Sequence, residues 1–195
     1  YFNITDVLRW VIFVSIIIWI GMKKVLKIVF WVMCGVFVLG LVMPQNLQMP
    51  VDGAGSGDYN HKTFWYPWGG RARVHKGVDI FAKRGTKIHS ATLGVVVSTG
   101  YLSSGGNYVT ILGPKWRVYY YAHLNEILVK EGDFVSHKSL IGTVGNTGSA
   151  AKTPSHLHFA IFTFVPYPWR IDTSTDGWKK MFYLNPIDYL KKVED

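Results

Sequence analysis

Two histidines separated by one residue are the first feature of this chain that could bind a metal or transfer a proton. His156 and His158 lie in the apolar run His156–Phe162 (HLHFAIF), whose composition is typical of a β-strand. Residues i and i+2 of a strand point to the same face, so both imidazoles are expected to point the same way. Two such histidines in a core are costly without partners, and this favours a metal site.

Three further residues extend the pair. His75 and Asp79 are four residues apart, and Gly77 between them argues against a helix, so a loop that enters a strand is expected to bring both side chains together. His123 follows the aromatic strand expected over 118–122 and is expected to begin a turn. The histidines that match no such pattern are expected at the surface: His61, His89 and His137.

These residue types suit a catalytic zinc site, which has three nitrogen, oxygen or sulfur ligands and one open position. His75, Asp79 and one histidine of the 156/158 pair can supply three ligands, and the spacing does not decide which of the pair it is. His123 and the remaining histidine are then available for proton transfer. Zinc activates water and polarises a carbonyl oxygen, and these parts suffice for amide hydrolysis.

Longer stretches around these residues resemble the lysostaphin-type (LytM-like) zinc metallopeptidases, which cleave bacterial cell walls. The resemblance covers about residues 68–162, half of the chain. The stretches that carry it follow in the family's order: His75–Ile80 (HKGVDI), Tyr121–Leu124 (YAHL), Val129–Val135 (VKEGDFV), Ile141–Gly148 (IGTVGNTG) and His156–Phe159 (HLHF).

This resemblance implies a role for each of the five residues. His75, Asp79 and His158 would be the ligands of Zn²⁺, and His123 and His156 would be the catalytic histidines beside the metal. It also implies an antiparallel β-sheet or sandwich of the duplicated hybrid motif type, with peptidoglycan as substrate. The bond that is cleaved stays open, between D-Ala and diaminopimelate or within a glycine bridge.

Two departures from the family pattern lie after His158. Ala160 stands where the family often has Glu, and by alternation it shares the face of His156 and His158, so a contact to the metal site or the substrate is expected to be missing. An aromatic segment, 165–184, separates the last strand from Asn185–Pro186. We expect this segment to cover its own domain; walling the substrate groove and docking on the membrane are the alternatives.

Two other functions compete with a peptidoglycan endopeptidase. A non-catalytic wall-binding or regulatory protein on the same fold typically lacks metal ligands, but all three are present here. Residues 129–141 (VKEGDFVSHKSLI) resemble a hairpin of biotinyl or lipoyl carriers, yet no exposed Met-Lys-Met-like turn follows, and a carrier needs no paired histidines. The sequence therefore favours the enzyme.

The elements that must position these residues are short strands. Runs of β-branched and aromatic residues alternate with Gly, Asn and Pro over 78–81, 94–99, 108–112, 118–122, 140–144 and 156–162. After residue 50 only 186–192 suggests a helix. We therefore predict an all-β domain of antiparallel strands over residues 60–195. Within it, the Gly/Ser/Thr-rich stretch 145–155 is expected to form a mobile loop at the rim of a cleft.

The first fifty residues are predominantly apolar. Val25–Met43 contains 19 residues with a single charge, Lys27, which is about the length of a membrane-spanning helix. Lys23 and Lys24 precede it, and positive residues on this flank favour a cytoplasmic N-terminus. No A-x-A-like cleavage site follows. We therefore expect residues 22–44 to be an uncleaved, single-pass signal anchor in the bacterial cytoplasmic (inner) membrane, with the peptidase domain periplasmic or extracellular.

Three smaller predictions complete the N-terminal part. Residues 1–21 are an uncertain apolar leader: either translation begins at Met22, or the leader forms a hairpin of two membrane segments. Residues 45–59, which contain Pro50 and several glycines, are expected to be a linker. Cys34 is the only cysteine, which excludes a disulfide within the chain, and it is expected to pack in the membrane helix.

The charge is positive throughout. The chain of 195 residues has a formal net charge of +9, and residues 51–195 hold 17 Lys and Arg against 11 Asp and Glu. A basic surface favours an acidic partner such as nucleic acid, anionic lipid or an anionic wall polymer. No nucleic-acid motif and no dense basic run is present in the sequence, so no nucleic-acid partner is expected.

Overall fold

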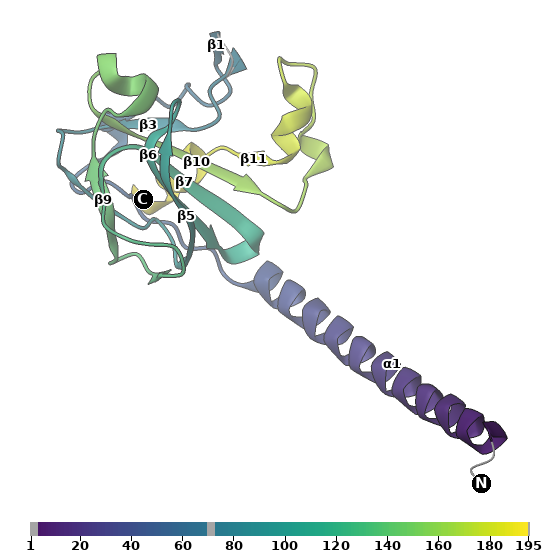
Figure 1. Ribbon diagram of the computed structural model, residues 1–195. Helices are drawn as coiled ribbons and strands as arrows, with labels where there is room; N and C mark the ends of the chain where they lie inside the picture. Colours follow the sequence, from purple (N-terminus) through teal and green to yellow (C-terminus); the bar gives the residue numbers. More distant parts are fainter. Residues whose placement is uncertain (1–3, 70–72, 195) are drawn as a thin grey trace. The chain divides into compact units, whose positions relative to one another are not determined.

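The structure, a computed structural model, describes residues 4–69 and 73–194 (Figure 1). It divides into two compact units, one that ends at Val42 and one that begins at Met43.

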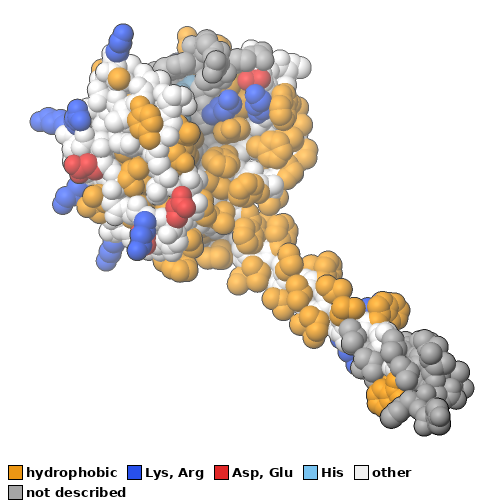
Figure 2. Space-filling view, in the orientation of Figure 1, with side chains coloured by type: hydrophobic (Ala, Val, Ile, Leu, Met, Phe, Trp, Pro, Cys, Tyr) orange, Lys and Arg blue, Asp and Glu red, His pale blue; other side chains and the backbone are white. Residues whose placement is uncertain are grey.

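The first unit is one continuous helix, α1 (Ile4–Val42). The helix runs without a break through Gly21 and Met22, so the alternative of a hairpin of two membrane segments is wrong. Residues 21–42 have a mean hydropathy of 2.5 and span 22 residues. At 1.5 Å per residue this is about 33 Å, close to the hydrocarbon thickness of a bilayer. By length and composition this stretch is able to cross a membrane, and Figure 2 shows hydrophobic side chains along the helix.

The second unit is built on a nine-stranded antiparallel sheet, which confirms the predicted fold class. Its strands are β3 (Val78–Phe81), β4 (Lys87–His89), β5 (Gly94–Leu102), β6 (Gly106–Gly113), β7 (Arg117–Ile127), β8 (Phe134–Val135), β9 (Leu140–Val144), β10 (His156–Thr163) and β11 (Tyr183–Leu184). The order is β11-β10-β7-β6-β5-β8, while β3 also pairs with β10, and β9 pairs with both β7 and β4. A separate two-stranded sheet joins β1 (Pro67–Gly69) and β2 (Arg73–Val74).

Helical structure is scarce in this unit. The described helices are five short 3-10 turns and one α-helix: η1 (Ser56–Asp58), η3 (Pro114–Trp116), η4 (Gly148–Lys152), η5 (Pro168–Arg170), η6 (Gly177–Met181) and α2 (Ile187–Glu194). The C-terminal helix was expected over 186–192, and α2 confirms it.

The core lies under one face of the sheet, and alternation decides which residues enter it. Leu157, Phe159 and Ile161 of β10 are fully buried among other core residues. His156 and His158, which alternate with them, consequently point to the opposite face, as the sequence predicts. The hydrophobic residues of β10 therefore fix the direction of the two imidazoles.

Residues 45–59 differ from the expected linker because their apolar side chains join the core. Leu47, Val51 and Tyr59 are buried, and Val51 and Tyr59 form bridges with strand residues. The side chain of His137 hydrogen-bonds the Asn46 carbonyl at 2.7 Å. Apart from this segment, the predicted strands are observed with ends shifted by a few residues, chiefly in β5, β6 and β7.

The aromatic segment 165–184 folds back on its own domain. Its two 3-10 turns, η5 and η6, are joined by a backbone hydrogen bond between Tyr167 and Met181. The Trp65 indole donates to the Thr175 carbonyl at 3.0 Å, and Arg117 donates to the Tyr167 hydroxyl at 3.2 Å. This is the arrangement that the sequence favoured over a groove wall or a membrane contact.

Candidate metal centre and cleft

The position of β10 between β3 and β7 assembles the site. In the register of the sheet, His158 lies opposite Asp79 of β3 on one side and opposite Ala122 of β7 on the other. Residues directly opposite each other on neighbouring strands share a face. Strand pairing therefore brings Asp79 to the face that His156 and His158 occupy.

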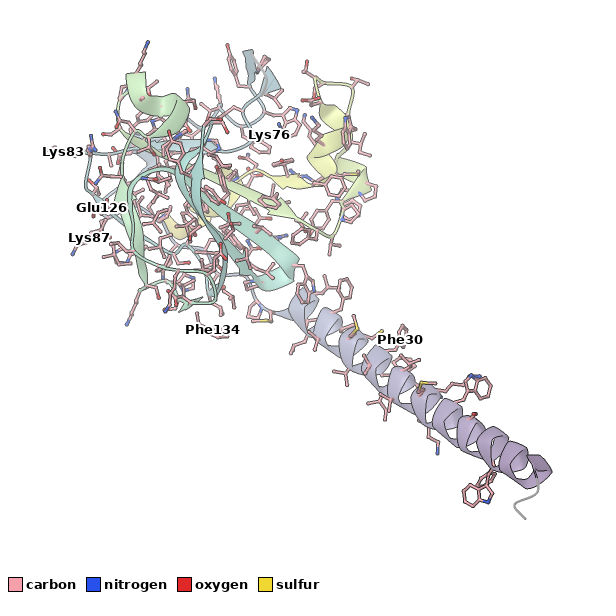
Figure 3. All side chains as sticks on the ribbon, viewed as in Figure 1. Phe30, Lys76, Lys83, Lys87, Glu126 and Phe134 are labelled. Atoms are coloured by element: carbon pink, nitrogen blue, oxygen red, sulfur yellow. The ribbon has the colours of Figure 1, made fainter. Side chains whose placement is uncertain are left out.

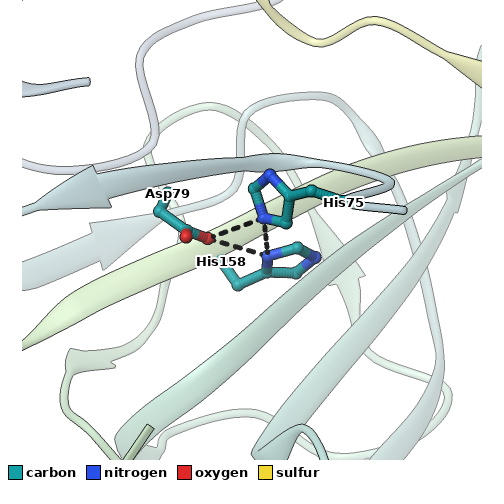
Figure 4. A group of neighbouring side chains, drawn as sticks. All are labelled: His75, Asp79 and His158. Carbon is teal, nitrogen blue, oxygen red and sulfur yellow. Dashed lines mark hydrogen bonds and ion pairs between the residues drawn. The ribbon is translucent and has the colours of Figure 1, made fainter. Parts of the chain in front are cut away.

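Three of the predicted residues meet at one point (Figure 4). His75 Nε2 lies 3.1 Å from Asp79 Oδ1 and 3.1 Å from His158 Nδ1. His158 Nδ1 lies 2.8 Å from the same Asp79 oxygen. His75 reaches this point from the loop that precedes β3, as expected, whereas the other two side chains come from paired strands.

The three side chains have more acceptor atoms than protons to share, so a bound cation satisfies them better than hydrogen bonds among themselves. His75 Nδ1 lies 3.2 Å from the Thr63 carbonyl, to which it donates, so His75 Nε2 is left as an acceptor. Asp79 Oδ1 is also an acceptor, and a single proton on His158 Nδ1 satisfies only one of them. Ligating histidines commonly donate their other ring nitrogen to a backbone carbonyl in this way. Two imidazoles and a carboxylate with converging lone pairs are suitable ligands for zinc.

Electrostatics keep the carboxylate charged and one imidazole neutral. Burial raises the pKa of Asp79, but its close contacts with the imidazoles of His158 and His75 outweigh burial and hold that pKa well below its usual range. Burial is also the main cause that lowers the pKa of His158, against the opposing effect of Asp79. Both shifts favour the protonation states that metal ligands require.

Gly77 makes room for the His158 ring. A Cβ atom at position 77 would lie 2.5 Å from the Phe159 carbonyl oxygen and 2.8 Å from His158 Nε2. The loop from His75 to Asp79 approaches β10 this closely only because residue 77 has no side chain.

His123 reaches the same face through a β-bulge. From Tyr121 to Leu124 the strand β7 takes three steps while the facing part of β6 takes two, and His123 has a left-handed φ of 64°. Tyr121 and Leu124 enter the core, and Ala122 and His123 both line the cleft. The expectation that His123 begins a turn is therefore wrong: the strand continues to Ile127, and the bulge re-aims the side chain.

Two backbone carbonyls of the 145–155 loop orient the remaining imidazoles. His123 Nδ1 donates to the Thr147 carbonyl at 2.9 Å, and His156 Nδ1 donates to the Pro154 carbonyl at 2.8 Å. Each bond leaves Nε2 as the acceptor nitrogen. Sequence reasoning missed Thr147 and Pro154, because they act through main-chain atoms and their side chains give no signal.

The two rings lie beside the metal ligands. The centroids of His123 and His156 are 5.0 Å apart, and His156 Nε2 lies 3.9 Å from Asp79 Oδ1. Burial is the first cause that lowers the pKa of His123 to about 4, and repulsion by His158 adds to it. His123 is consequently neutral at neutral pH and available to accept a proton.

All five predicted residues line one cleft of about 580 Å³. The rest of its wall is mostly small or neutral: Val74, Lys76, Phe81, Ser104, Gly105, Tyr120, Ala122, Ser149, Ala150, Thr153 and Pro154. No residue of the segment 165–184 is part of this wall. Ala160 lies opposite Tyr120 in the register and is buried, so no carboxylate stands at the position where the family often has Glu.

The other histidines lie outside the cleft, as expected. His61 Nε2 hydrogen-bonds the Ser56 carbonyl, and His89 lies 3.1 Å from the Asp52 carboxylate. His89 and His137 contact the segment that precedes residue 60, whereas the contact of His61 is local.

Comparisons with known proteins identify the class to which this fold and site belong. Residues 73–167 match the family described as Peptidase family M23, so this part of the chain is an M23 peptidase domain. The match contains all five site residues, and it excludes the carrier alternative.

Two curated relatives and one solved structure illustrate the similarity. The chain is 35% identical over 129 residues to an L-Ala–D-Glu endopeptidase of Bacillus subtilis, covering 57% of this chain. It is 38% identical over 144 residues to the peptidoglycan DD-endopeptidase ShyC of Vibrio cholerae, covering 71%. The catalytic domain of lysostaphin from Staphylococcus simulans superposes with a TM-score of 0.55 at 27% identity, covering 68% of this chain and 91% of that one. The chain spans only 39% and 33% of the length of the two curated relatives.

Proposed function

We propose that this chain is a zinc-dependent endopeptidase that hydrolyses peptide bonds of bacterial peptidoglycan. The observation that carries the proposal is the convergence of two kinds of imidazole in one cleft. His75 and His158 join Asp79 in a metal-ligand cluster, while His123 and His156 lie beside it with their Nδ1 atoms held by carbonyls. A protein that only binds the wall needs neither the metal-ligand histidines nor the two histidines beside them.

In this proposal His75, Asp79 and His158 hold Zn²⁺, and the ion supplies Lewis-acid polarisation of the scissile carbonyl. His123 accepts a proton from the attacking water, because its lowered pKa leaves it neutral at neutral pH. His123 then returns that proton to the leaving amine, with His156 beside it to assist the transfer. Water and one amide bond are consumed, and a carboxylate and an amine are produced.

The names of the relatives support peptidoglycan as the substrate, since both curated proteins are endopeptidases and one is named for peptidoglycan. The length and composition of α1 support a membrane anchor, which would place the domain outside the cytoplasmic membrane beside this substrate. Zn²⁺, peptidoglycan and the membrane are therefore the proposed cofactor, substrate and location.

Alanine variants of the five residues test the proposal. His75→Ala, Asp79→Ala and His158→Ala should lose stoichiometric zinc, because two remaining ligands hold the ion weakly. His123→Ala and His156→Ala should keep zinc but cleave purified muropeptides about 10²–10⁴-fold more slowly, the usual effect of an acid–base group. Zinc content and digestion with and without a chelator are the measurements.

His61→Ala, which removes an imidazole outside the cleft, is the matched control and should keep both zinc and rate. Full zinc in the Asp79→Ala variant would contradict the ligand assignment. Normal digestion by both the His123→Ala and His156→Ala variants would show that these histidines are bystanders.

A further inference from the structure

The cleft contains one cationic side chain that the reaction does not use. Among the described residues, Lys76 is the only Lys or Arg that lines the cleft, and Asp79 is the only carboxylate. The Asp79 oxygen is already occupied by His75 and His158. The hydroxyl groups of the wall, such as those of Ser149 and Thr153, are neutral. With a divalent cation at the metal cluster, the cleft is strongly positive and is suited to an anionic ligand.

Lys76 is placed to meet such a ligand beside the reacting bond. It follows the metal-ligand candidate His75 directly in the chain, and both residues line the same cleft. Its ammonium group lies 5.7 Å from the centre of the ring of Tyr183, a residue outside the cleft wall, so the Lys76 side chain extends from the cleft towards the aromatic segment 165–184. Figure 3 labels Lys76 in the upper middle of the domain and Lys83 at its left edge.

Among the described residues, Lys76 forms no ion pair with a carboxylate. Asp176 attracts the ammonium group of Lys76 but pairs directly with Lys179 at 3.3 Å. Asp172 pairs in the same way with Lys180. Because both acids of this segment are engaged by other lysines, the charge of Lys76 remains available to a substrate.

We propose that Lys76 binds a free carboxylate of the substrate next to the scissile amide. The substrate is then an acidic peptide, in which a residue such as glutamate or diaminopimelate carries that carboxylate, and not a bridge made of glycine. A glycine bridge has no internal carboxylate with which the ammonium group can pair. This inference rests on the proposed peptidoglycan endopeptidase and names the class of bond that it cleaves.

Paired substrates that differ only at that carboxylate test the inference on the full-length, zinc-loaded protein. One pair contains a scissile L-Ala–D-Glu bond and the other a scissile D-Ala–diaminopimelate bond, each with the adjacent carboxylate either free or amidated. The wild type should prefer the free acid in at least one pair. Lys76→Gln should lower kcat/KM for that free acid by about tenfold, mainly through KM, the effect of losing one charge-assisted hydrogen bond.

Lys76→Gln should leave the rate on the amidated substrate and the zinc content unchanged, and Lys76→Arg should retain most of the preference. Lys83→Gln removes an equal charge from an exposed lysine outside the cleft, and it should behave as the wild type. Equal losses on free and amidated substrates, no loss on either, or faster cleavage of a pentaglycine peptide would overturn the inference.

Binding measurements distinguish a failure of this inference from a failure of the proposed function. The affinity of the intact peptides is measured by calorimetry with the zinc-loaded His123→Ala variant, with and without Lys76→Gln. If the wild type cleaves none of the peptides while Lys76→Gln still weakens binding of the free acid alone, the proposed endopeptidase function is wrong and the carboxylate site stands. If binding does not depend on the carboxylate, the site is wrong whatever the activity.

Discussion

The imidazoles of the cleft differ in which ring nitrogen points into the site. His158 offers Nδ1 to the metal cluster, whereas His75, His123 and His156 have Nδ1 on or near a backbone carbonyl and offer Nε2. An Asn side chain places its amide group near the position of Nδ1. A His to Asn substitution therefore imitates His158, which presents Nδ1, better than it imitates the histidines that present Nε2.

The lowered pKa of His123 leads to a prediction about acid pH. The neutral imidazole is the form that accepts a proton, and burial lowers its pKa from 6.5 to about 4. Cleavage should therefore persist as the pH falls through 6.5 and decline only as it approaches 4. A divalent cation beside the ring acts in the same direction. The measurement is kcat/KM for a soluble muropeptide between pH 4 and 8, with the zinc content determined at each pH.

The zinc determination separates the two causes of a loss at low pH. A decline that parallels loss of zinc reports protonation of the ligands. A decline centred near pH 6.5 with zinc fully retained would show that His123 is not the desolvated base described here.

Elements, rather than single residues, explain which parts of the site follow from the sequence. The alternation of Leu157, Phe159 and Ile161 with the two histidines is visible in the sequence, so the direction of the HLH pair was predictable. The bulge at His123 was not predictable, because the shift of one residue depends on the register between β7 and β6, which the alternation of residues within β7 does not reveal. The assignment of His158 as the ligand of the pair depended on the family resemblance, and the spacing alone left it open.

The close approach of the His75–Asp79 loop to β10 predicts that Gly77→Ala damages the site. The added Cβ meets the Phe159 carbonyl oxygen at 2.5 Å, so either β10 or the loop must move. We expect a loss of unfolding free energy of about 1–3 kcal/mol, with weaker zinc binding because His158 is displaced. Chemical denaturation and zinc competition measure the two effects.

Gly57→Ala is the matched control, because a Cβ at position 57 meets nothing within 4 Å. It should leave stability nearly unchanged and zinc affinity unchanged. Equal behaviour of the two variants would mean that the loop and β10 are not in contact as described.

The segment before residue 60 has the composition of a linker but is part of the domain. Its Pro and Gly residues suggest flexibility, yet Leu47, Val51 and Tyr59 are spaced so that each enters the core. Isolated apolar residues among turn residues give no periodic signal, so their burial could not be predicted.

Truncation at two positions tests where the domain begins. A chain of residues 43–195 should fold cooperatively and retain zinc, because it contains the whole second unit. A chain of residues 60–195 loses three buried side chains, each worth about 1.5–3 kcal/mol, and should be largely unfolded or strongly destabilised. Thermal unfolding of the two chains is the measurement, and equal melting temperatures would show that the segment is a linker after all.

At the scale of the whole molecule, the connection between the two units is short in sequence. Only residues 43–46 separate Val42, the last residue of α1, from Leu47, the first buried residue of the domain. If α1 is a membrane anchor, no long linker joins it to the domain.

The distribution of lysines around the apolar stretch predicts the orientation of the whole protein. Lys23, Lys24 and Lys27 lie at the N-terminal end of the stretch 21–42, and positive residues are retained on the cytoplasmic side. A reporter that is active only outside the cytoplasm, fused after Asp195, should be active, and one active only inside should not. The fusion should also stay in the membrane fraction after high-salt washing, because the interaction of α1 with lipid is hydrophobic and is not screened.

Replacing all three lysines by glutamine, with two lysines inserted after Met43, should reduce or invert this pattern of reporter activity. Reporter activity confined to the cytoplasm in the unmodified protein would contradict the orientation and separate the enzyme from a wall substrate, whereas a soluble product that begins near residue 45 would contradict the anchor alone.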